Sequence, residues 1–214
     1  MKAAPRGGAA SSTILFIFRS DGRLLAFSEN KMNIVILAAG MGKRMHSRLP
    51  KVLQPIAGRP MIDHVLDASE GLSASPRVVV VGHAAENVME HLADRSDVTF
   101  ALQSPQLGTG HALRQALGQL DRNEPKTLVC LGDVPLLSRR TLEAIAREAE
   151  TSDLVLLTVE LDNPTGYGRI LRNPAGFVRA IVEEKDASPE ERRVREVNTG
   201  IMCLPTSRLD GWLS

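Results

Sequence analysis

The segment from Leu37 to Lys51 combines small residues with cations, which is the pattern of a phosphate-binding turn. It reads LAAGMGKRM and then LPK, with glycines at 40 and 42 and positive charges at Arg44 and Lys51. Glycine relieves the steric limits on a tight turn, and successive backbone amides in such a turn form an anion-binding concavity. Arg binds phosphate through two parallel hydrogen bonds, whereas Lys acts as a point charge. We therefore expect this segment to hold the phosphates of a nucleotide.

Two better-known glycine motifs do not fit this segment. The dinucleotide fingerprint requires a third glycine where this sequence has Met45, and the P-loop requires a Gly-Lys-Ser/Thr that the sequence lacks. A dinucleotide-dependent oxidoreductase is therefore disfavoured.

A carboxylate and an amide follow two other apolar runs. Asp133, in LGDVPL, comes directly after one run and suits Mg²⁺, which takes one or two carboxylates together with substrate phosphates and water. Taken alone, Asp133 fits a helix cap or a turn equally well. Gln103 stands shortly before Gly108 and Thr109, and this pattern indicates an amide that reads a base beside a glycine-rich helix entry.

The elements that must position these residues alternate from residue 33 onward. Apolar β-branched runs predict strands at 33–37, 77–81, 98–102, 127–131 and 153–161, and helical periodicity predicts helices at 61–69, 85–93, 110–120 and 140–150. This alternation predicts an α/β fold with a mostly parallel, Rossmann-like sheet flanked by helices. Such a sheet binds its ligand at the carboxyl ends of its strands.

The pattern changes after residue 161. Segments 168–172 and 177–183 flank an Asn-Pro-Ala-Gly turn and predict a small β-hairpin insertion. The charged stretch 184–196 predicts a solvated loop or short helix, 199–204 predicts a strand, and 207–214 predicts the beginning of a helix.

Composition bounds the function classes. The chain has 214 residues, 43% hydrophobic residues and a net charge of +1, so nothing indicates nucleic acid or a membrane as a partner.

Cys130 and Cys203 lie in apolar runs and indicate two buried free thiols, with a disulfide as the alternative. The five histidines show no metal-ligand spacing, and we interpret them as surface or structural residues. Residues 1–31 differ in composition and charge from the rest of the chain. We interpret them as a disordered leader or as a mis-assigned start before Met32, with a weak targeting signal as the alternative.

Six motifs taken together resemble a known family. LAAGxGxRM with LPK, Q with LGTGHA, GDVPL, DNPTGYGRI, IVEEKDA and EVNTGI occur in order from Met32 to the end of the chain. They resemble the uridylyltransferase domain of the bacterial bifunctional N-acetylglucosamine-1-phosphate uridylyltransferase and glucosamine-1-phosphate acetyltransferase. The first motif marks only the wider sugar-nucleotidyltransferase superfamily, whereas the later motifs narrow the resemblance to this branch.

The resemblance implies a Mg²⁺-dependent transfer of UMP from UTP to N-acetylglucosamine-1-phosphate. The products would be UDP-N-acetylglucosamine, a precursor for peptidoglycan and lipopolysaccharide, and pyrophosphate. It implies Arg44, Lys51 and Asp133 as catalytic residues, with Asp133 as a Mg²⁺ ligand. It further implies a substrate site made of Leu37, Ala38, Ala39, Gly40, Lys51, Gln103, Gly108, Thr109, Leu131, Gly132, Asp133, Gly168, Glu183 and Asn198.

The resemblance also carries expectations about the whole protein. It implies a cytoplasmic enzyme whose full-length parent is a homotrimer. It further implies that residues 32–214 are a uridylyltransferase domain cut before its end, without the left-handed β-helix of the acetyltransferase. The family's second metal ligand, an asparagine, would follow Ser214, so we expect slow turnover from this chain. Leu131 departs from the family, where an aromatic residue is common.

Two rival interpretations remain. The chain could instead be another sugar-1-phosphate nucleotidyltransferase that transfers a thymidylyl or guanylyl group. Such an enzyme would prefer a different substrate from UTP in a panel of nucleoside triphosphates. An inactive nucleotide-binding domain would bind the nucleotide without turnover.

Overall fold

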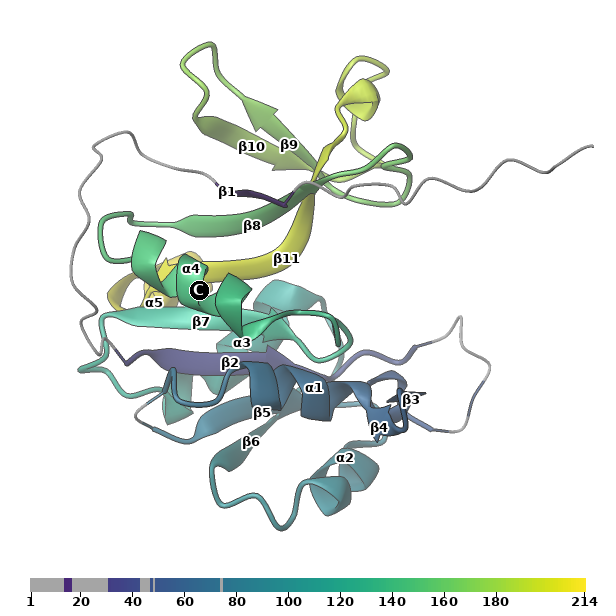
Figure 1. Ribbon diagram of the computed structural model, residues 1–214, viewed down its shortest axis with the longest axis vertical. Helices are drawn as coiled ribbons and strands as arrows, with labels where there is room; N and C mark the ends of the chain where they lie inside the picture. The colour runs from purple at the N-terminus through teal and green to yellow at the C-terminus, as the bar shows by residue number, and fades with distance from the viewer. Residues whose placement is uncertain (1–13, 17–30, 43–46, 48, 74) are drawn as a thin grey trace, which may run out of the picture. The chain divides into compact units, whose positions relative to one another are not determined.

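The computed structural model describes residues 14–16, 31–42, 47, 49–73 and 75–214 (Figure 1). They fall into two compact units. Unit 1 contains β1 (Ile14–Phe16) and Leu157–Thr199, and unit 2 contains the described residues from 31 to 156 together with Gly200–Ser214. The boundaries between the units fall within two strands, β8 (Val155–Glu160) and β11 (Glu196–Pro205).

The sheet of unit 2 is mostly parallel. The end of β11 lies at one side, followed in order by β7 (Lys126–Leu131), β2 (Asn33–Leu37), β5 (Arg77–Val81) and β6 (Val98–Leu102). Only the pairing of β11 with β7 is antiparallel. Strands β2 and β5 are buried almost throughout, because helices cover both faces of such a sheet.

The register places the carboxyl ends of the parallel strands at one edge. Leu37, the last residue of β2, pairs with Leu131, the last residue of β7. Val81 and Leu102, the last residues of β5 and β6, also pair with each other. Segments that are distant in the sequence therefore leave the sheet side by side.

The described residues of unit 2 form five α-helices: α1 (Met61–Ala68), α2 (Ala85–His91), α3 (Thr109–Ala116), α4 (Arg139–Glu148) and α5 (Leu209–Trp212). Helix α3 buries Ala112, Leu113 and Ala116 in the same apolar cluster as Val35 and Val80. Helices α1 and α4 contact each other and lie on the viewer's side of the sheet in Figure 1. Helix α4 begins at an N-cap, where Ser138 Oγ accepts a hydrogen bond from Thr141 N at 3.1 Å.

Short elements complete unit 2. Strands β3 (Pro55–Ile56) and β4 (Arg59–Pro60) form a separate two-stranded sheet before α1. Single 3₁₀ turns span Lys51–Leu53, Leu117–Gln119 and Thr206–Arg208. The first of these turns begins with the lysine that the sequence analysis selected.

Unit 1 is built on antiparallel strands. Strands β9 (Arg169–Arg172) and β10 (Val178–Val182) form a hairpin, and β9 also pairs with β11. Strand β8 pairs with β1 on one side and neighbours β11 on the other. Asn173 Oδ1 stabilises the hairpin turn by accepting hydrogen bonds from the backbone of Ala175 and Phe177, each at 3.0 Å. A 3₁₀ turn spans Glu191–Arg193.

The predicted fold is confirmed, with two corrections to its elements. Strand β11 begins at Glu196, the last residue of the stretch that the charge pattern assigned to a solvated loop or short helix. Glu196 is buried in this strand because two hydrogen bonds from Arg172, at 2.6 and 2.8 Å, compensate its charge. The predicted helix 110–120 begins at Thr109 and ends at Ala116, where the chain tightens into a 3₁₀ turn.

Two further expectations concern thiols and membranes. Cys130 and Cys203 are both free and buried, as the apolar runs indicated. Within the described ranges, none of the helices has the length and apolar character required to traverse a lipid bilayer.

Candidate functional site

The candidate site in unit 2 lies where the parallel strands end. Ala38 follows β2 and donates a backbone hydrogen bond to Val80 O at 2.8 Å, while Gly132 follows β7 and donates one to Leu37 O at 2.9 Å. A Cβ added to Gly132 would be 3.3 Å from Leu37 O of β2 and 3.2 Å from Val52 Cγ1 of the 3₁₀ turn Lys51–Leu53. The predicted site residues at 37–40 and 131–133 thus form one continuous edge of the sheet.

Lys51 and Asp133 form an ion pair at this edge. Asp133 follows the carboxyl end of β7, and Lys51 begins the 3₁₀ turn before β3. Both side chains are partly open to solvent, with exposed fractions of 42% for Lys51 and 27% for Asp133. The sequence predicted both residues as site residues, and the structure brings their charged groups into contact.

Gly42 explains how the glycine turn meets the lysine. Its φ of +56° lies in the left-handed region, and a Cβ built on it would be 2.9 Å from Lys51 Cβ. A side chain at this position would therefore be strained and would also displace Lys51. Arg44, the other predicted catalytic cation, lies outside the described residues.

Gln103 lies at the same edge, directly after β6, and its side chain is buried with an exposed fraction of 3%. Its Nε2 donates to Gly108 O at 2.9 Å and contacts His111 Nδ1 at 3.1 Å. Gly108 is the N-cap of α3 and has a φ of +103°, and Thr109 is the first residue of the helix. The amide that we expected to read a base is thus held against the glycine-rich helix entry.

Gly82 was missed by the sequence analysis although it joins these two parts of the site. A Cβ built on Gly82 would lie 2.8 Å from both Ala39 Cβ and Gln106 Nε2. Gln106 in turn donates to Gln103 O at 3.3 Å. A glycine directly after the apolar run of β5 was the available signal, because a buried strand that ends in glycine allows another backbone to approach closely.

The three remaining predicted residues lie together in unit 1. Gly168 O accepts a hydrogen bond from Asn198 N at 2.8 Å, and a Cβ added to Gly168 would lie 3.2 Å from Glu183 Oε1. Gly168 is buried and Glu183 is exposed, and Ile181 Cγ2 would lie 3.1 Å from the same added Cβ. The structure therefore gathers Gly168, Glu183 and Asn198 into one group.

Arg169 and Glu184, which the sequence analysis did not select, hold the loop before this group. Arg169 Nη2 donates to Glu184 Oε2 at 2.7 Å, and the same oxygen accepts from Gly166 N at 2.9 Å. The Gly166 amide and the Arg169 guanidinium hold the pKa of Glu184 below its usual range. Both residues lie within the quoted motifs PTGYGRI and VEEKDA, so their positions were the available signal.

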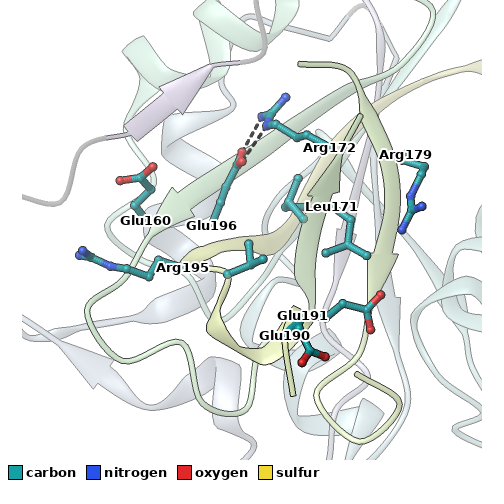
Figure 2. Close-up of a pocket in the computed structure, with 10 residues that line it drawn as sticks. Glu160, Leu171, Arg172, Arg179, Glu190, Glu191, Arg195 and Glu196 are labelled. Carbon is teal, nitrogen blue, oxygen red and sulfur yellow. Dashed lines mark hydrogen bonds and ion pairs between the residues drawn. The ribbon is translucent and has the colours of Figure 1, made fainter. Parts of the chain in front are cut away.

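Unit 1 also has a surface hollow of about 670 Å³ (Figure 2). It is lined by Ile170, Leu171 and Val194 and by charged side chains that include Arg172 and Glu196, which bond to each other in Figure 2. Gly168, Glu183 and Asn198 are not among its lining residues. The hollow is therefore separate from the group that the sequence predicted.

The residues around Asp133 fit a magnesium ion that is held jointly with a substrate. Lys51 binds one carboxylate oxygen of Asp133, which leaves the other oxygen as a ligand. The structure contains no group of three His, Cys, Asp or Glu side chains suited to a metal, as far as the described residues go. A single carboxylate suits Mg²⁺ only when substrate phosphates and water supply the remaining oxygens.

Comparison with known proteins assigns this arrangement to a family. Residues 34–199 match the family model described as the MobA-like NTP transferase domain. The chain belongs to this family. The expected class, a nucleotidyltransferase, is therefore confirmed for this NTP transferase domain.

Curated relatives confirm the resemblance on which the expectation rested. The chain is 60% identical over 183 residues to the bifunctional protein GlmU of Cupriavidus pinatubonensis and 60% identical over 182 residues to that of an Azoarcus species. The match to the first covers 86% of this chain and 40% of the relative, and the match to the second covers 85% and 40%. The chain thus spans about 40% of the length of the curated relatives it matches.

Solved structures support the fold. HddC from Yersinia pseudotuberculosis aligns with 84% of this chain and 79% of its own, at 22% identity and a TM-score of 0.63. The same values hold for HddC complexed with GMP-PN. At this identity the likeness establishes the fold alone.

Proposed function

We propose that this domain transfers UMP from UTP to N-acetylglucosamine-1-phosphate, with Mg²⁺, to give UDP-N-acetylglucosamine and pyrophosphate. One observation carries the proposal: Lys51 and Asp133 form an ion pair beside the Gly42 turn, at the carboxyl edge of the parallel sheet. A cation, a carboxylate and a turn of small residues at this edge are what a metal-bound triphosphate requires. The relatives named GlmU, at about 60% identity, support the choice among sugar-1-phosphate nucleotidyltransferases.

In the proposed reaction, a phosphate oxygen of the sugar phosphate attacks the α-phosphorus of UTP, and pyrophosphate leaves in line. No nucleophilic side chain is needed, so the protein acts by positioning two anions and by stabilising charge. Backbone amides of the turn at 38–42 would bind the triphosphate, with Lys51 as a point charge beside it. Mg²⁺, when bound through Asp133, supplies further positive charge at the phosphates.

The two ends of the substrates would meet different residues. Gln103 uses both Nε2 hydrogens within the protein, toward Gly108 O and His111 Nδ1, so its Oε1 remains available to accept from the base. The N3–H of uracil is such a donor. Gly168, Glu183 and Asn198 would recognise the acetamido sugar, where a carboxylate accepts hydroxyl or amide hydrogens.

An assay of pyrophosphate release tests the proposal. The chain is mixed with UTP and N-acetylglucosamine-1-phosphate, with Mg²⁺ or with a chelator, and is compared with mixtures that contain other nucleoside triphosphates or glucose-1-phosphate. We expect release with the first pair and Mg²⁺ only. Faster release with dTTP or GTP would indicate a nucleotidyltransferase of different base preference and would contradict this proposal. Binding of UTP without any release of pyrophosphate would indicate a nucleotide-binding domain without activity.

A further inference from the structure

Three side chains form a continuous line of contacts behind the edge where the base is proposed to bind. His111, in the first turn of α3, lies between two glutamines. Its Nδ1 is 3.1 Å from Gln103 Nε2, and its Nε2 is 3.1 Å from Gln115 Nε2. Gln115 follows His111 by one helical turn and is partly buried like it. Gln103 is thus linked to two further side chains, both on α3.

Gly108 O decides how the amide of Gln103 is turned. A carbonyl oxygen only accepts, so the group that faces it at 2.9 Å must be the amide nitrogen of Gln103. The second hydrogen of that nitrogen points to His111 Nδ1, which therefore accepts. Reversing the amide would bring Gln103 Oε1 against Gly108 O, and also against His111 Nδ1 as long as that nitrogen carries no hydrogen.

The same reasoning fixes the histidine. A neutral imidazole has one donor and one acceptor nitrogen, so it cannot accept from both glutamines. Because Nδ1 accepts from Gln103, Nε2 must carry the hydrogen and donate. The amide of Gln115 must then be turned so that its Oε1 accepts from Nε2, and its hydrogen bond to His111 O at 3.3 Å is given up. The line therefore runs in one direction, from Gln103 through His111 to Gln115.

We propose that His111 is a positioning residue that locks the amide of Gln103 with its oxygen toward the base and so sets the preference for uracil over cytosine. The inference rests on the proposed function, because it assumes that Gln103 meets a pyrimidine. Uracil donates at N3 and matches a fixed oxygen. Cytosine accepts at N3 and matches Gln103 only when the amide is reversed, which Gly108 O opposes and His111, with Nδ1 as an acceptor, opposes further.

The test is the ratio of the dissociation constants for CTP and UTP, measured by calorimetry on the whole chain with Mg²⁺. For His111→Ala we expect this ratio to fall about five- to tenfold, the effect of losing one hydrogen bond. For His111→Asn we expect the ratio to be restored, because the amide oxygen of Asn can accept in place of Nδ1. For Gln103→Leu we expect a ratio near one.

Two further measurements separate positioning from loss of structure. His91→Ala is the matched control, since His91, the last residue of α2, bonds to Asp63 of α1, and we expect its ratio to equal that of the wild type. Nitrogen NMR of the wild-type imidazole is expected to show Nε2 protonated and Nδ1 bare.

The proposal would be overturned if His111→Ala weakened both nucleotides equally, if it left the ratio unchanged, or if Nδ1 carried the hydrogen. If the wild type bound UTP and CTP with equal affinity, this would instead contradict the recognition of the base by Gln103, and with it the role of His111.

Discussion

Gly40 and Gly42 belong to the same turn but have different surroundings. Gly42 has a positive φ, and a Cβ added to it would contact Lys51. Gly40 has no positive φ, and no atom lies within 4 Å of a Cβ added to it. We expect Gly42→Ala to lower the free energy of unfolding by about 1–3 kcal/mol, through strain and the displacement of Lys51. Gly40→Ala should change it by less than about 0.5 kcal/mol. Urea unfolding of both variants checks this, and equal losses would contradict the different roles of the two glycines.

Asp133 is the residue on which the proposed metal chemistry depends. Asp133→Ala removes the carboxylate that would hold Mg²⁺, so we expect it to raise the barrier to turnover by several kcal/mol, on the order of 10²- to 10⁴-fold in rate. Asp133→Asn, which keeps the size of the side chain but not its charge, should lose a similar amount. The check is the rate of pyrophosphate release across a range of Mg²⁺ concentrations. Unchanged rates in both variants would remove Asp133 from the metal site.

Single residues were predictable where local sequence carries the signal. Gly40, Lys51 and Asp133 could be selected because small residues, a cation and a carboxylate follow apolar runs. Their contacts could not be predicted, because the ion pair of Lys51 and Asp133 joins segments far apart in the chain. His111 was interpreted as a surface or structural residue for the same reason, since its contact with Gln103 depends on the path between β6 and α3.

Among the elements, the side chains of β8, β9 and β11 are joined by one buried carboxylate in unit 1. Glu196 accepts from Arg172 on β9 and from Thr158 on β8, the latter at 2.8 Å. Burial acts to raise the pKa of Glu196, but the hydrogen bonds from Arg172 and Thr158 outweigh it and hold this pKa below the ordinary value of 4.5. These strands are therefore stabilised by an ionised group.

This predicts an acid-dependent stability for unit 1. A carboxyl whose pKa is lower in the folded state stabilises the fold above its unfolded pKa, and this contribution is lost as the pH falls through the folded pKa. We expect Glu196→Gln to destabilise unit 1 by about 1–3 kcal/mol at pH 7, which allows for partial solvent exposure of Arg172. The difference from the wild type should shrink as the pH falls below 4.5. Amide hydrogen exchange in β9 and β11 at several pH values checks this, and a difference independent of pH would contradict it.

The elements themselves were predicted more accurately in unit 2 than in unit 1. Apolar runs that follow Asn33 and Arg77 identify β2 and β5 with their observed bounds, because each strand is covered on both faces. The beginning of β11 was missed because Glu196 can be buried only with Arg172, which is supplied by a different strand. Charge patterns do not show which partner a carboxylate will meet.

At the scale of the whole molecule, the chain passes between its two units within β8 and β11. The part of unit 1 from Leu157 to Thr199 is therefore inserted in the sequence of unit 2, whereas β1 precedes unit 2. The two cysteines both belong to unit 2, and burial raises the pKa of each thiol to about 12. Because the thiolate is the reactive form, both cysteines should be inert while unit 2 is folded.

The cysteines can therefore report on unit 2 separately from unit 1. In native buffer at pH 8, we expect no reaction of either thiol with a disulfide reagent, and two thiols to react in denaturant.

In Glu196→Gln, loss of amide protection in β9 should begin at a lower guanidinium concentration than in the wild type, because the destabilisation is local to unit 1. Thiol reactivity should keep its wild-type midpoint, because no contact of Cys130 or Cys203 is altered by the substitution. If the two probes shifted together, the units would unfold as one cooperative body. The pH-dependent stability that Glu196 contributes would then also affect the carboxyl edge of the parallel sheet in unit 2.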